Sequence, residues 1–428
     1  RGDAEALREL VLVRPPVVHL KADFYGGIPG IPSGIAYLAA SVRAAGFPVR
    51  VIDAFGTAPH RFFTFRRRYR ARGLTPGEIA DLTPRDSIAG ISVHCAGEHS
   101  MSCSIIRELK ARAPFRPVIV GGYHATFVPD DFIAAGADYA VMGEGENRLP
   151  GLLAGLERGL GAEGLEGIAG RDGKVERKTR YVVDLDSQPF AAVELLPLEN
   201  YWKLGYGHGP VMRNVRYMNI LTSRGCPYKC SFCQAPEMSG GRWLRKSPQR
   251  VLEEIRWHMD RFGVRDFHIQ DENFAVDRKR VEEICRGLID GGFGITFCFP
   301  SGLKMETLDR ELLELLARSG VDEVVMPVMT PFPATASMND PELQGFREMD
   351  ELCFSPVWRR DYRKLDGFRR WTYVHFYVVR LLHHPLSFLA MLGRIFTGRS
   401  RTKGEMTARR MVRDLLDKLA SLGGPEVE

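Results

Sequence analysis

Short apolar runs alternate with stretches of helical periodicity over the first 155 residues. Apolar positions between residues 35 and 42 recur every three or four residues and stop at Gly46, as on one face of a helix. A second helix is indicated over 105–113. Strands that alternate with helices predict a parallel, doubly wound sheet, so we take 1–155 as a Rossmann-like first domain. Its expected strands are 10–13, 49–52, 88–93, 118–120 and 139–142.

A second alternating pattern begins near residue 217 and predicts a barrel or part of one. Ser247 is expected to cap a helix that has Pro248 at its first position. We place this unit at 217–335, after a linker at 156–216 that is rich in glycine and charged residues. A helical C-terminal region, 336–428, follows. The expected strands of the second unit are 219–222, 267–270, 295–299 and 324–328.

Composition excludes several classes of protein. The chain has 428 residues, 44% of them hydrophobic and 26% charged, which is typical of a globular protein with two or three domains. A formal net charge of only +6 argues against a dedicated nucleic-acid binder. Eight cysteines are too few for a secreted disulfide framework, so we expect a reduced, cytoplasmic protein.

Two segments have ambiguous patterns. Arginines interleave with aromatic residues near the start of 60–86, a composition that suits either contact with an anionic ligand or a solvated helix. We favour the helix. Residues 371–410 combine an aromatic, apolar stretch with basic residues, which suits helices that cover the barrel or an amphipathic segment at a membrane surface or over a hydrophobic substrate. We favour the covering helices.

The strongest chemical signal is a group of three cysteines, Cys226, Cys230 and Cys233, spaced as CxxxCxxC. They follow an expected strand in a loop with Gly225 and Pro227, so their thiolates can converge on one soft metal centre. A zinc site needs a fourth cysteine or histidine at matching spacing, which is absent nearby. Three ligands on a [4Fe–4S] cluster instead leave one iron open for substrate.

The stretch 223–233, Ser-Arg-Gly-Cys-Pro-Tyr-Lys-Cys-Ser-Phe-Cys, resembles the signature of the radical S-adenosylmethionine (SAM) superfamily. The resemblance implies that the open iron chelates the amino and carboxylate groups of SAM. One electron then cleaves the S–C5′ bond to give a 5′-deoxyadenosyl radical, and the protein binds and orients these cofactors. It also implies an external single-electron donor such as a flavodoxin or ferredoxin.

The same resemblance implies SAM contacts. Phe232 stands where the family places an aromatic residue near the adenine. Asp271, Glu272 and Asn273 resemble the polar segment that holds the SAM amino group, and Ser301 stands near the carboxylate or ribose. An alternative for Asp271 and Glu272 is a helix N-cap followed by an acidic residue in the first turn.

The first domain resembles the cobalamin-binding domain that precedes one large class of radical SAM enzymes. Glycines at strand ends let the backbone approach a flat macrocycle and its nucleotide tail. A doubly wound domain that binds no corrin is the alternative. The residues expected to bind cobalamin are Ser33, Gly34, Asp53, Ser92, Val93, His94, Gly121, Gly122, His124, Thr126, Gly143, Glu144, Gly145 and Glu146.

Two departures from the family pattern stand out. Many cobalamin proteins carry an Asp-x-His-x-x-Gly loop whose histidine ligates cobalt from below, but here Phe55 and Ala58 replace the histidine and the glycine. A bound cobalamin is therefore expected to lack a histidine lower ligand. In addition, 329–335 resembles the motif after the sixth barrel strand yet follows the fourth directly, so we expect a partial (β/α)6 barrel that lacks about two β/α units.

The resemblance implies a cobalamin-dependent radical SAM enzyme, and the first hypothesis is methylation of an unactivated carbon in a small molecule. One alternative is an oxidative cyclase or other redox enzyme that uses both cofactors without methyl transfer. Another is a cobalamin-binding sensor without catalytic activity, against which the open-iron cysteine motif argues.

Overall fold

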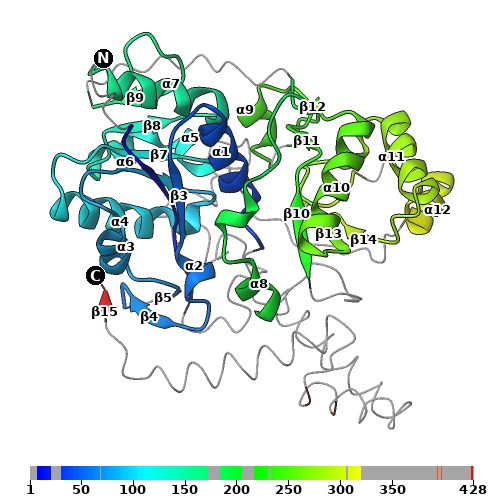
Figure 1. The fold of residues 1–428 in the computed structure, drawn as a ribbon, viewed down its shortest axis with the longest axis horizontal. Helices are drawn as coiled ribbons and strands as arrows, with labels where there is room; N and C mark the ends of the chain where they lie inside the picture. Colours follow the sequence, from blue (N-terminus) through cyan, green and yellow to red (C-terminus); the bar gives the residue numbers. More distant parts are fainter. Residues whose placement is uncertain are drawn as a thin grey trace, which may run out of the picture.

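The computed structural model describes residues 7–20, 30–67, 69–171, 184–204, 216–230, 233–304 and 307–319, with Gly393, Thr397 and Glu426–Val427. Two β/α units lie side by side, and short segments between them carry α8 (Leu198–Leu204) and α9 (Ala235–Ser239) (Figure 1). The fourth strand expected at 324–328, the junction at 329–335 and nearly all of 336–428 fall outside the described residues.

The first unit is built on a six-stranded sheet, which confirms the predicted doubly wound architecture. Five strands are parallel, and the last one pairs antiparallel with its neighbour. The chain moves outward from β1 in both directions, so the order of the strands reverses between β1 and β6. Ligands of such sheets bind outside the carboxyl ends of the strands at this point. The order is β3 (Val49–Asp53), β1 (Leu10–Arg14), β6 (Ile88–Ser92), β7 (Val118–Gly121), β8 (Tyr139–Val141) and β9 (Ile168–Gly170).

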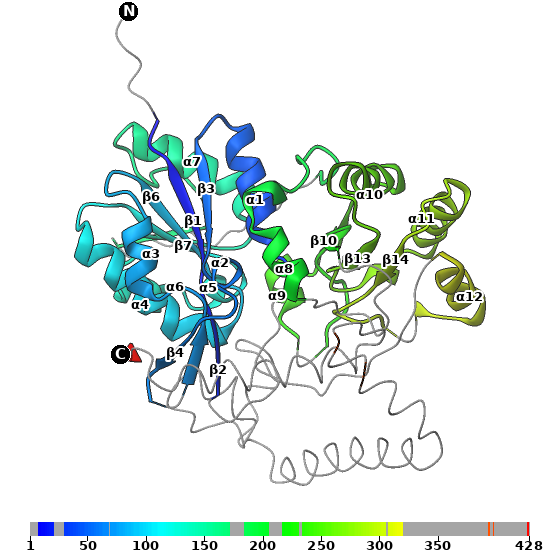
Figure 2. The same ribbon diagram turned by 60° about the horizontal axis from the view of Figure 1, so that its bottom comes forward.

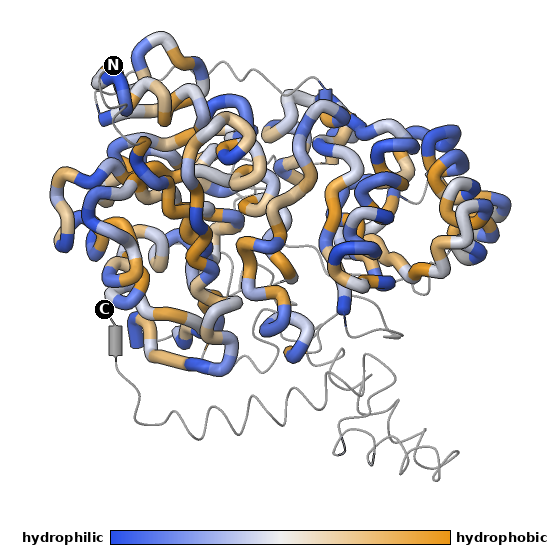
Figure 3. The backbone as a smooth tube through the Cα atoms, viewed as in Figure 1, coloured by the Kyte–Doolittle hydropathy of each residue, from blue (hydrophilic) through white to orange (hydrophobic). Residues whose placement is uncertain are grey.

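Alternate residues of the central strands supply two separate apolar cores. Leu10 and Leu12 pack with α1 (Ser33–Ala44) and α7 (Gly145–Glu157), whereas Val11 and Val13 pack on the other side with α3, α4 and α6. This two-residue period places helices on both faces of the sheet. Hydrophobic segments accordingly concentrate on the central strands (Figure 3). The helices of the second face are α3 (Pro76–Leu82), α4 (His99–Arg112) and α6 (Pro129–Ala134).

The helix favoured for the arginine-rich start of 60–86 is wrong, because this stretch forms a β-hairpin. Strands β4 (Phe62–Phe65) and β5 (Tyr69–Arg72) pair antiparallel, and β5 also pairs with β2 (Val17–Leu20), which continues from the carboxyl end of β1 (Figure 2). The aromatic side chains of Phe63, Phe65 and Tyr69 are buried in the second core. They are therefore structural, and strand β15 (Glu426–Val427) adds to the hairpin at β4.

The described parts of the expected linker, 156–171 and 184–204, contain regular secondary structure. Strand β9 extends the first sheet, and α8 packs against α2 (Ala54–Thr57) at the end of β3. The Trp202 indole N–H of α8 donates to the Tyr217 carbonyl at 2.9 Å. The segment thus attaches the first unit to the first strand of the second.

The described part of the second unit contains three parallel strands, β10 (Tyr217–Ile220), β13 (Asp266–Ile269) and β14 (Thr296–Cys298). A short antiparallel ribbon, β11 (Ser223–Arg224) with β12 (Leu244–Arg245), follows the first strand. Ser247 caps α10 as predicted: its side chain accepts from the Arg250 N–H at 3.1 Å, and Pro248 is the first helical residue. The helices of this unit are α10 (Pro248–Phe262), α11 (Arg278–Asp290) and α12 (Arg310–Ser319).

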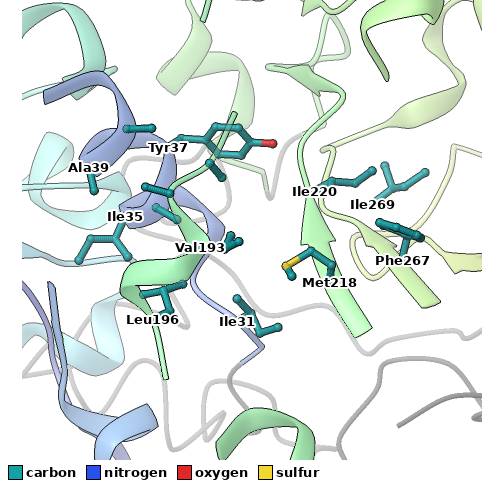
Figure 4. Packing of buried hydrophobic residues seen from close by; sticks show 14 of the residues in the cluster. Ile31, Ile35, Tyr37, Ala39, Val193, Leu196, Met218, Ile220, Phe267 and Ile269 are labelled. Carbon is teal, nitrogen blue, oxygen red and sulfur yellow. The ribbon is translucent and has the colours of Figure 1, made fainter. Parts of the chain in front are cut away.

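One apolar core is continuous between the two units. Ile35 and Ala39 of α1 lie in the same cluster as Val193 of the connecting segment and Met218 and Phe267 of the second sheet (Figure 4). No helix in the described ranges is long and apolar enough to span a bilayer.

A buried histidine lies within this shared core. His258 of α10 is fully buried beside Phe262 and Phe267, and neither ring nitrogen has a hydrogen-bond partner among the described residues. Burial lowers the pKa of His258 to about 4, and the nearby Glu254 only partly opposes this effect. The imidazole is therefore neutral in the folded protein.

We predict that His258 makes the protein less stable in acid. The unfolded chain binds a proton near pH 6.5 that the folded chain binds only near pH 4, so the free energy of unfolding falls as the pH falls through this window, by up to about 3 kcal/mol. Denaturant unfolding at pH 7 and pH 4.5 measures the effect. His258→Leu should weaken the pH dependence of the free energy of unfolding. Equal pH dependence in wild type and His258→Leu would contradict the assignment.

Candidate functional site: two facing loop clusters

The loops after β6, β7 and β8 meet at the carboxyl edge of the first sheet, where α1 also begins. The Val93 N–H donates to the Gly121 carbonyl at 2.8 Å, and the His124 N–H donates to the Val93 carbonyl at 3.1 Å. The Gly143 N–H donates to Thr126 Oγ1 at 2.9 Å, which joins the third loop to the second. Val93, Gly121, His124, Thr126 and Gly143 therefore come together, and Ser92 and exposed His94 flank Val93 in the chain. Ser33 and Gly34 are the first two residues of α1.

Gly122 is required by the backbone of this edge. Its φ is 103°, and a Cβ at this position would lie 2.7 Å from the Val93 carbonyl oxygen. The glycine therefore allows the loop after β7 to cross close to the loop after β6. Its presence is explained by this crossing whether or not a ligand approaches.

His124 pairs with a histidine that the sequence analysis missed. His124 Nε2 lies 3.1 Å from Nδ1 of His99, the first residue of α4, and both rings pack on Phe132. Burial and the neighbouring His99 lower the pKa of His124 to about 4, so the ring is neutral at pH 7. The pairing joins residues 25 positions apart, and no local sequence pattern reports it.

Asp53, which was expected to contact cobalamin, lies in a buried polar cluster at the end of β3. It is 1% exposed, and its carboxylate accepts from the Gly56 N–H at 2.9 Å and from the Tyr201 hydroxyl at 2.6 Å, with the Arg14 guanidinium 3.6 Å away. Phe55 is fully buried beside the Tyr201 ring. This cluster attaches α8 to the end of β3, and Phe55 fills the core at the position that the Asp-x-His-x-x-Gly loop gives to its histidine.

The three cysteines lie on the loop that follows β11. Cys226 is buried, Cys233 is half-buried and Cys230 is exposed. Burial raises the pKa values of Cys226 and Cys233, and backbone N–H groups of Tyr228 and Ala235 oppose this by donating to the two sulfurs. The neighbouring cysteines also raise both pKa values, so the thiols are close enough to interact electrostatically. Phe232 falls outside the described residues.

Asp271 holds the start of this loop. Its Oδ1 accepts from the Thr222 N–H at 2.7 Å, and its Oδ2 accepts from the hydroxyls of Thr222 and Ser223, both at 2.6 Å. Glu272 accepts from the Gly225 N–H at 3.1 Å, and burial raises its pKa to about 7. Both acids, which were expected to contact SAM, accept hydrogen bonds from three of the four residues before Cys226, namely Thr222, Ser223 and Gly225.

The remaining residues expected to contact SAM differ in their surroundings. Asn273 Oδ1 accepts from the Ala275 N–H at 3.2 Å, which caps a short 3-10 turn, Phe274–Val276. Asn273 Nδ2 is buried without a hydrogen-bond partner among the described residues. Ser301 is exposed beyond β14. The side-chain amide N–H of Asn273 is thus an available hydrogen-bond donor beside the cysteine loop.

Arg224 links the cysteine loop to the first unit. Its Nη2 lies 2.5 Å from Glu146 Oε1, and its Nη1 lies 3.8 Å from Glu144 Oε1. Tyr123, in the loop after β7, is also close to the cysteines: burial raises its pKa, and Glu272, Cys233 and Cys226 raise it further. The carboxyl edge of the first sheet and the cysteine loop therefore face each other.

Comparison with known proteins agrees with this arrangement. Residues 27–153 match the B12 binding domain, and residues 220–343 match the radical SAM superfamily. The chain belongs to the radical SAM proteins that carry a B12-binding domain. The first match lies within the first β/α unit but begins after β1 and β2, and the second begins at Ile220, the last residue of β10.

Several relatives of this B12-binding radical SAM protein have named activities. It is 26% identical over 329 residues to cytidylyl-2-hydroxyethylphosphonate methyltransferase of Streptomyces wedmorensis, covering 69% of this chain and 61% of that protein. It is 26% identical over 278 residues to the anaerobic magnesium-protoporphyrin IX monomethyl ester cyclase of Synechocystis, covering 61% and 54%. Over 228 residues it is 28% identical to hopanoid C-3 methylase of Methylococcus capsulatus, covering 53% and 40%. The chain thus spans between two fifths and three fifths of these relatives.

A solved structure shares the fold. The radical SAM methyltransferase TsrM from Kitasatospora setae superposes with a TM-score of 0.52 at 20% identity, covering 73% of this chain and 58% of that chain. A second structure of TsrM, with a TM-score of 0.51, contains cobalamin and a [4Fe–4S] cluster.

The two domains of the B12-binding radical SAM protein imply cobalamin, a [4Fe–4S] cluster and SAM, and the residues present fit the cluster. Within the described residues, no three His, Cys, Asp or Glu side chains converge on a single ion. One zinc ion holds its thiolates about 2.3 Å from the metal and so less than about 4 Å apart. A cluster of several irons separates its cysteines further. Three thiols on one loop, two of them hydrogen-bonded by backbone N–H groups, have the donor chemistry such clusters use.

We predict that Asp271→Ala disrupts the cysteine loop. The change leaves the buried Thr222 N–H and two hydroxyls without their acceptor, at a cost of about 3 kcal/mol in the free energy of unfolding. The variant should lose most of its iron after anaerobic reconstitution, measured by iron analysis and visible absorbance. Asp290→Ala, at an exposed position at the end of α11, should keep both iron and stability. Full iron content and unchanged unfolding in Asp271→Ala would contradict this role.

Proposed function

We propose that the protein is a methyltransferase that acts on an unactivated carbon of a small molecule. Two of the relatives described above are named as methylases or methyltransferases of small molecules. The observation that carries the proposal is the direct ion pair between Arg224, two residues before Cys226, and Glu146 at the cobalamin edge. An enzyme that joins radical formation to methyl transfer needs its two cofactor sites to face each other in this way.

The residues of the chain bind and orient the cofactors. When bound, the cluster with SAM supplies hydrogen abstraction from the substrate, and cobalamin supplies methyl transfer. Cys226, Cys230 and Cys233 would hold the cluster, with Asp271 fixing the start of their loop. Asn273 Nδ2, buried and without a partner among the described residues, is the group we assign to SAM.

The loops of the first sheet would hold cobalamin. Val93 and His94 follow β6, Gly121 ends β7, and Thr126 lies on the short helix α5 (Tyr123–Phe127) that comes next; all lie at the carboxyl edge, where ligands of doubly wound sheets bind. Buried Phe55 supplies no ligand to the metal. We therefore propose a cobalamin without the lower histidine of the Asp-x-His-x-x-Gly loop, which suits a cofactor that must exchange a methyl group.

A second candidate function is oxidative cyclisation. The relatives include anaerobic magnesium-protoporphyrin IX monomethyl ester cyclases of Synechocystis and of Cereibacter sphaeroides, which supports a redox reaction without methyl transfer. The mass of the product separates the two functions. Methylation adds one CH2 unit, whereas cyclisation removes hydrogen or adds oxygen.

Either reaction requires reducing conditions. The proposed partner is a single-electron donor such as a flavodoxin or ferredoxin, because the cluster must receive one electron for each SAM cleaved. The compartment we propose is the cytoplasm, where thiols such as those of Cys226, Cys230 and Cys233 stay reduced.

We predict that anaerobically purified protein contains about four irons per chain and a stoichiometric corrin. With dithionite and SAM it should release 5′-deoxyadenosine. Cys230→Ala should lose both iron and SAM cleavage because one cluster ligand is removed, whereas Cys103→Ala, on α4, should retain both. Iron analysis, cobalamin spectra and chromatography of the nucleoside provide the measurements.

The outcomes distinguish the hypotheses. If the purified protein contains iron but no corrin, the methyltransferase proposal is wrong. The protein would then be a radical SAM enzyme whose first domain binds no cobalamin. Corrin without SAM cleavage by the reconstituted protein would favour a cobalamin sensor.

A further inference from the structure

An ion pair buried between the two units joins the two proposed cofactor sites. Arg224 has Glu146 on one nitrogen at 2.5 Å and Glu144 near the other at 3.8 Å. The three side chains are only 18%, 9% and 12% exposed, respectively. Removing one partner of such a pair leaves an uncompensated buried charge and is strongly destabilising. The positions of the two loops are therefore energetically linked.

Tyr37 of α1 reinforces the link from the first unit. Its ring lies beneath the Arg224 guanidinium, 5.8 Å from ring centre to Cζ. Its hydroxyl points from α1 toward the second sheet (Figure 4) and donates to Glu254 Oε1 at 2.5 Å, with Lys246 Nζ 3.2 Å away. Lys246 and Glu254 form their own ion pair at 2.5 Å and are almost fully buried. Tyr37 thus anchors the first unit in a polar cluster of the second.

The ion pairs of Arg224 are connected to one proposed cofactor site on each unit. On the first unit, the loop of Glu144 and Glu146 is tied to the loop after β7 through Gly143 and Thr126. On the second unit, Arg224 lies between Ser223, which Asp271 holds, and Gly225, which Glu272 holds. A displacement of the cysteine loop would move Arg224 away from Glu144 and Glu146.

We propose that Arg224 is a positioning residue that couples the two cofactor sites, so that assembly of the cluster tightens the binding of cobalamin. The inference rests on the proposed use of both cofactors. The cluster would hold the cysteines that continue the loop of Arg224. A shift of the loop when the cluster is lost would weaken the pairing of Arg224 with its two neighbouring carboxylates and so loosen the loop after β8. Because such coupling is reciprocal, cobalamin stabilises the cluster by the same factor.

The test measures the affinity for hydroxocobalamin rather than activity. Full-length protein, either reconstituted with iron and sulfide or stripped of its cluster by a chelator, is titrated anaerobically with hydroxocobalamin, and quenching of tryptophan fluorescence gives each dissociation constant. In wild type the reconstituted form should bind at least about fivefold more tightly, the lower end of typical coupling. In Arg224→Met the ratio of the two dissociation constants should fall to about one, and in Glu146→Gln this ratio should be smaller than in wild type.

Lys110→Met is the matched control. Lys110 Nζ lies 2.6 Å from Asp138 Oδ2 in an ion pair of similar burial, 16% and 21% exposed. The pair lies within the first unit, beside the start of β7, and so at the edge of the sheet opposite the cobalamin loops. This variant should keep the wild-type ratio.

Three outcomes decide the inference. If wild type binds hydroxocobalamin equally tightly with and without its cluster, the coupling is overturned and the proposed function is left intact. The same holds if Arg224→Met and Glu146→Gln both keep the wild-type ratio of the two dissociation constants. Absence of binding by wild type in both forms would overturn the proposed function itself. Because Glu146→Gln keeps the size of the side chain, it tests the coupling even where Arg224→Met fails to fold.

Discussion

The arrangement of the molecule depends on charges that are buried between its two units and must therefore be paired. Arg224, Glu144 and Glu146 lie in one group, and Lys246 and Glu254 in a second, with Tyr37 in contact with both. A buried ion pair contributes little net stability compared with an apolar contact, but it is costly to misplace. The apolar core shared by α1 and the second sheet holds the units together, and we infer that the polar groups fix how they are oriented.

The cysteine loop illustrates how a functional segment is held by residues distant in the sequence. Thr222, Ser223 and Gly225 all donate to acidic side chains of the segment after β13, nearly fifty positions later. These hydrogen bonds hold the backbone on both sides of Arg224, just N-terminal to the first cysteine. A Cβ at Gly225, where φ is 78°, would lie 2.3 Å from the Arg242 carbonyl, so the turn into the loop also requires glycine.

Much of this architecture could be predicted from the sequence because its signals are local. Short apolar runs located β1, β3, β6, β7 and β8, and the Ser-Pro pair located the start of α10. The β4–β5 hairpin was missed because arginines interrupt its aromatic pattern, and only the tertiary fold shows that Phe63 and Phe65 have a core to enter. The roles of Asp53, Asp271 and Glu146 were equally hidden. Their partners lie 148, 49 and 78 positions away, and an acid at a strand end has the same local pattern whether it binds a ligand or an arginine.

Electron paramagnetic resonance can show whether the cysteine loop and the cobalamin edge form one site. Protein loaded with cob(II)alamin is compared with and without the reduced cluster, and the relaxation rate of the cobalt signal is measured. We expect the paramagnetic cluster to accelerate this relaxation, because Arg224 connects the two loops directly. A cobalt signal that relaxes at the same rate with and without the cluster would show that the two loops do not form one site.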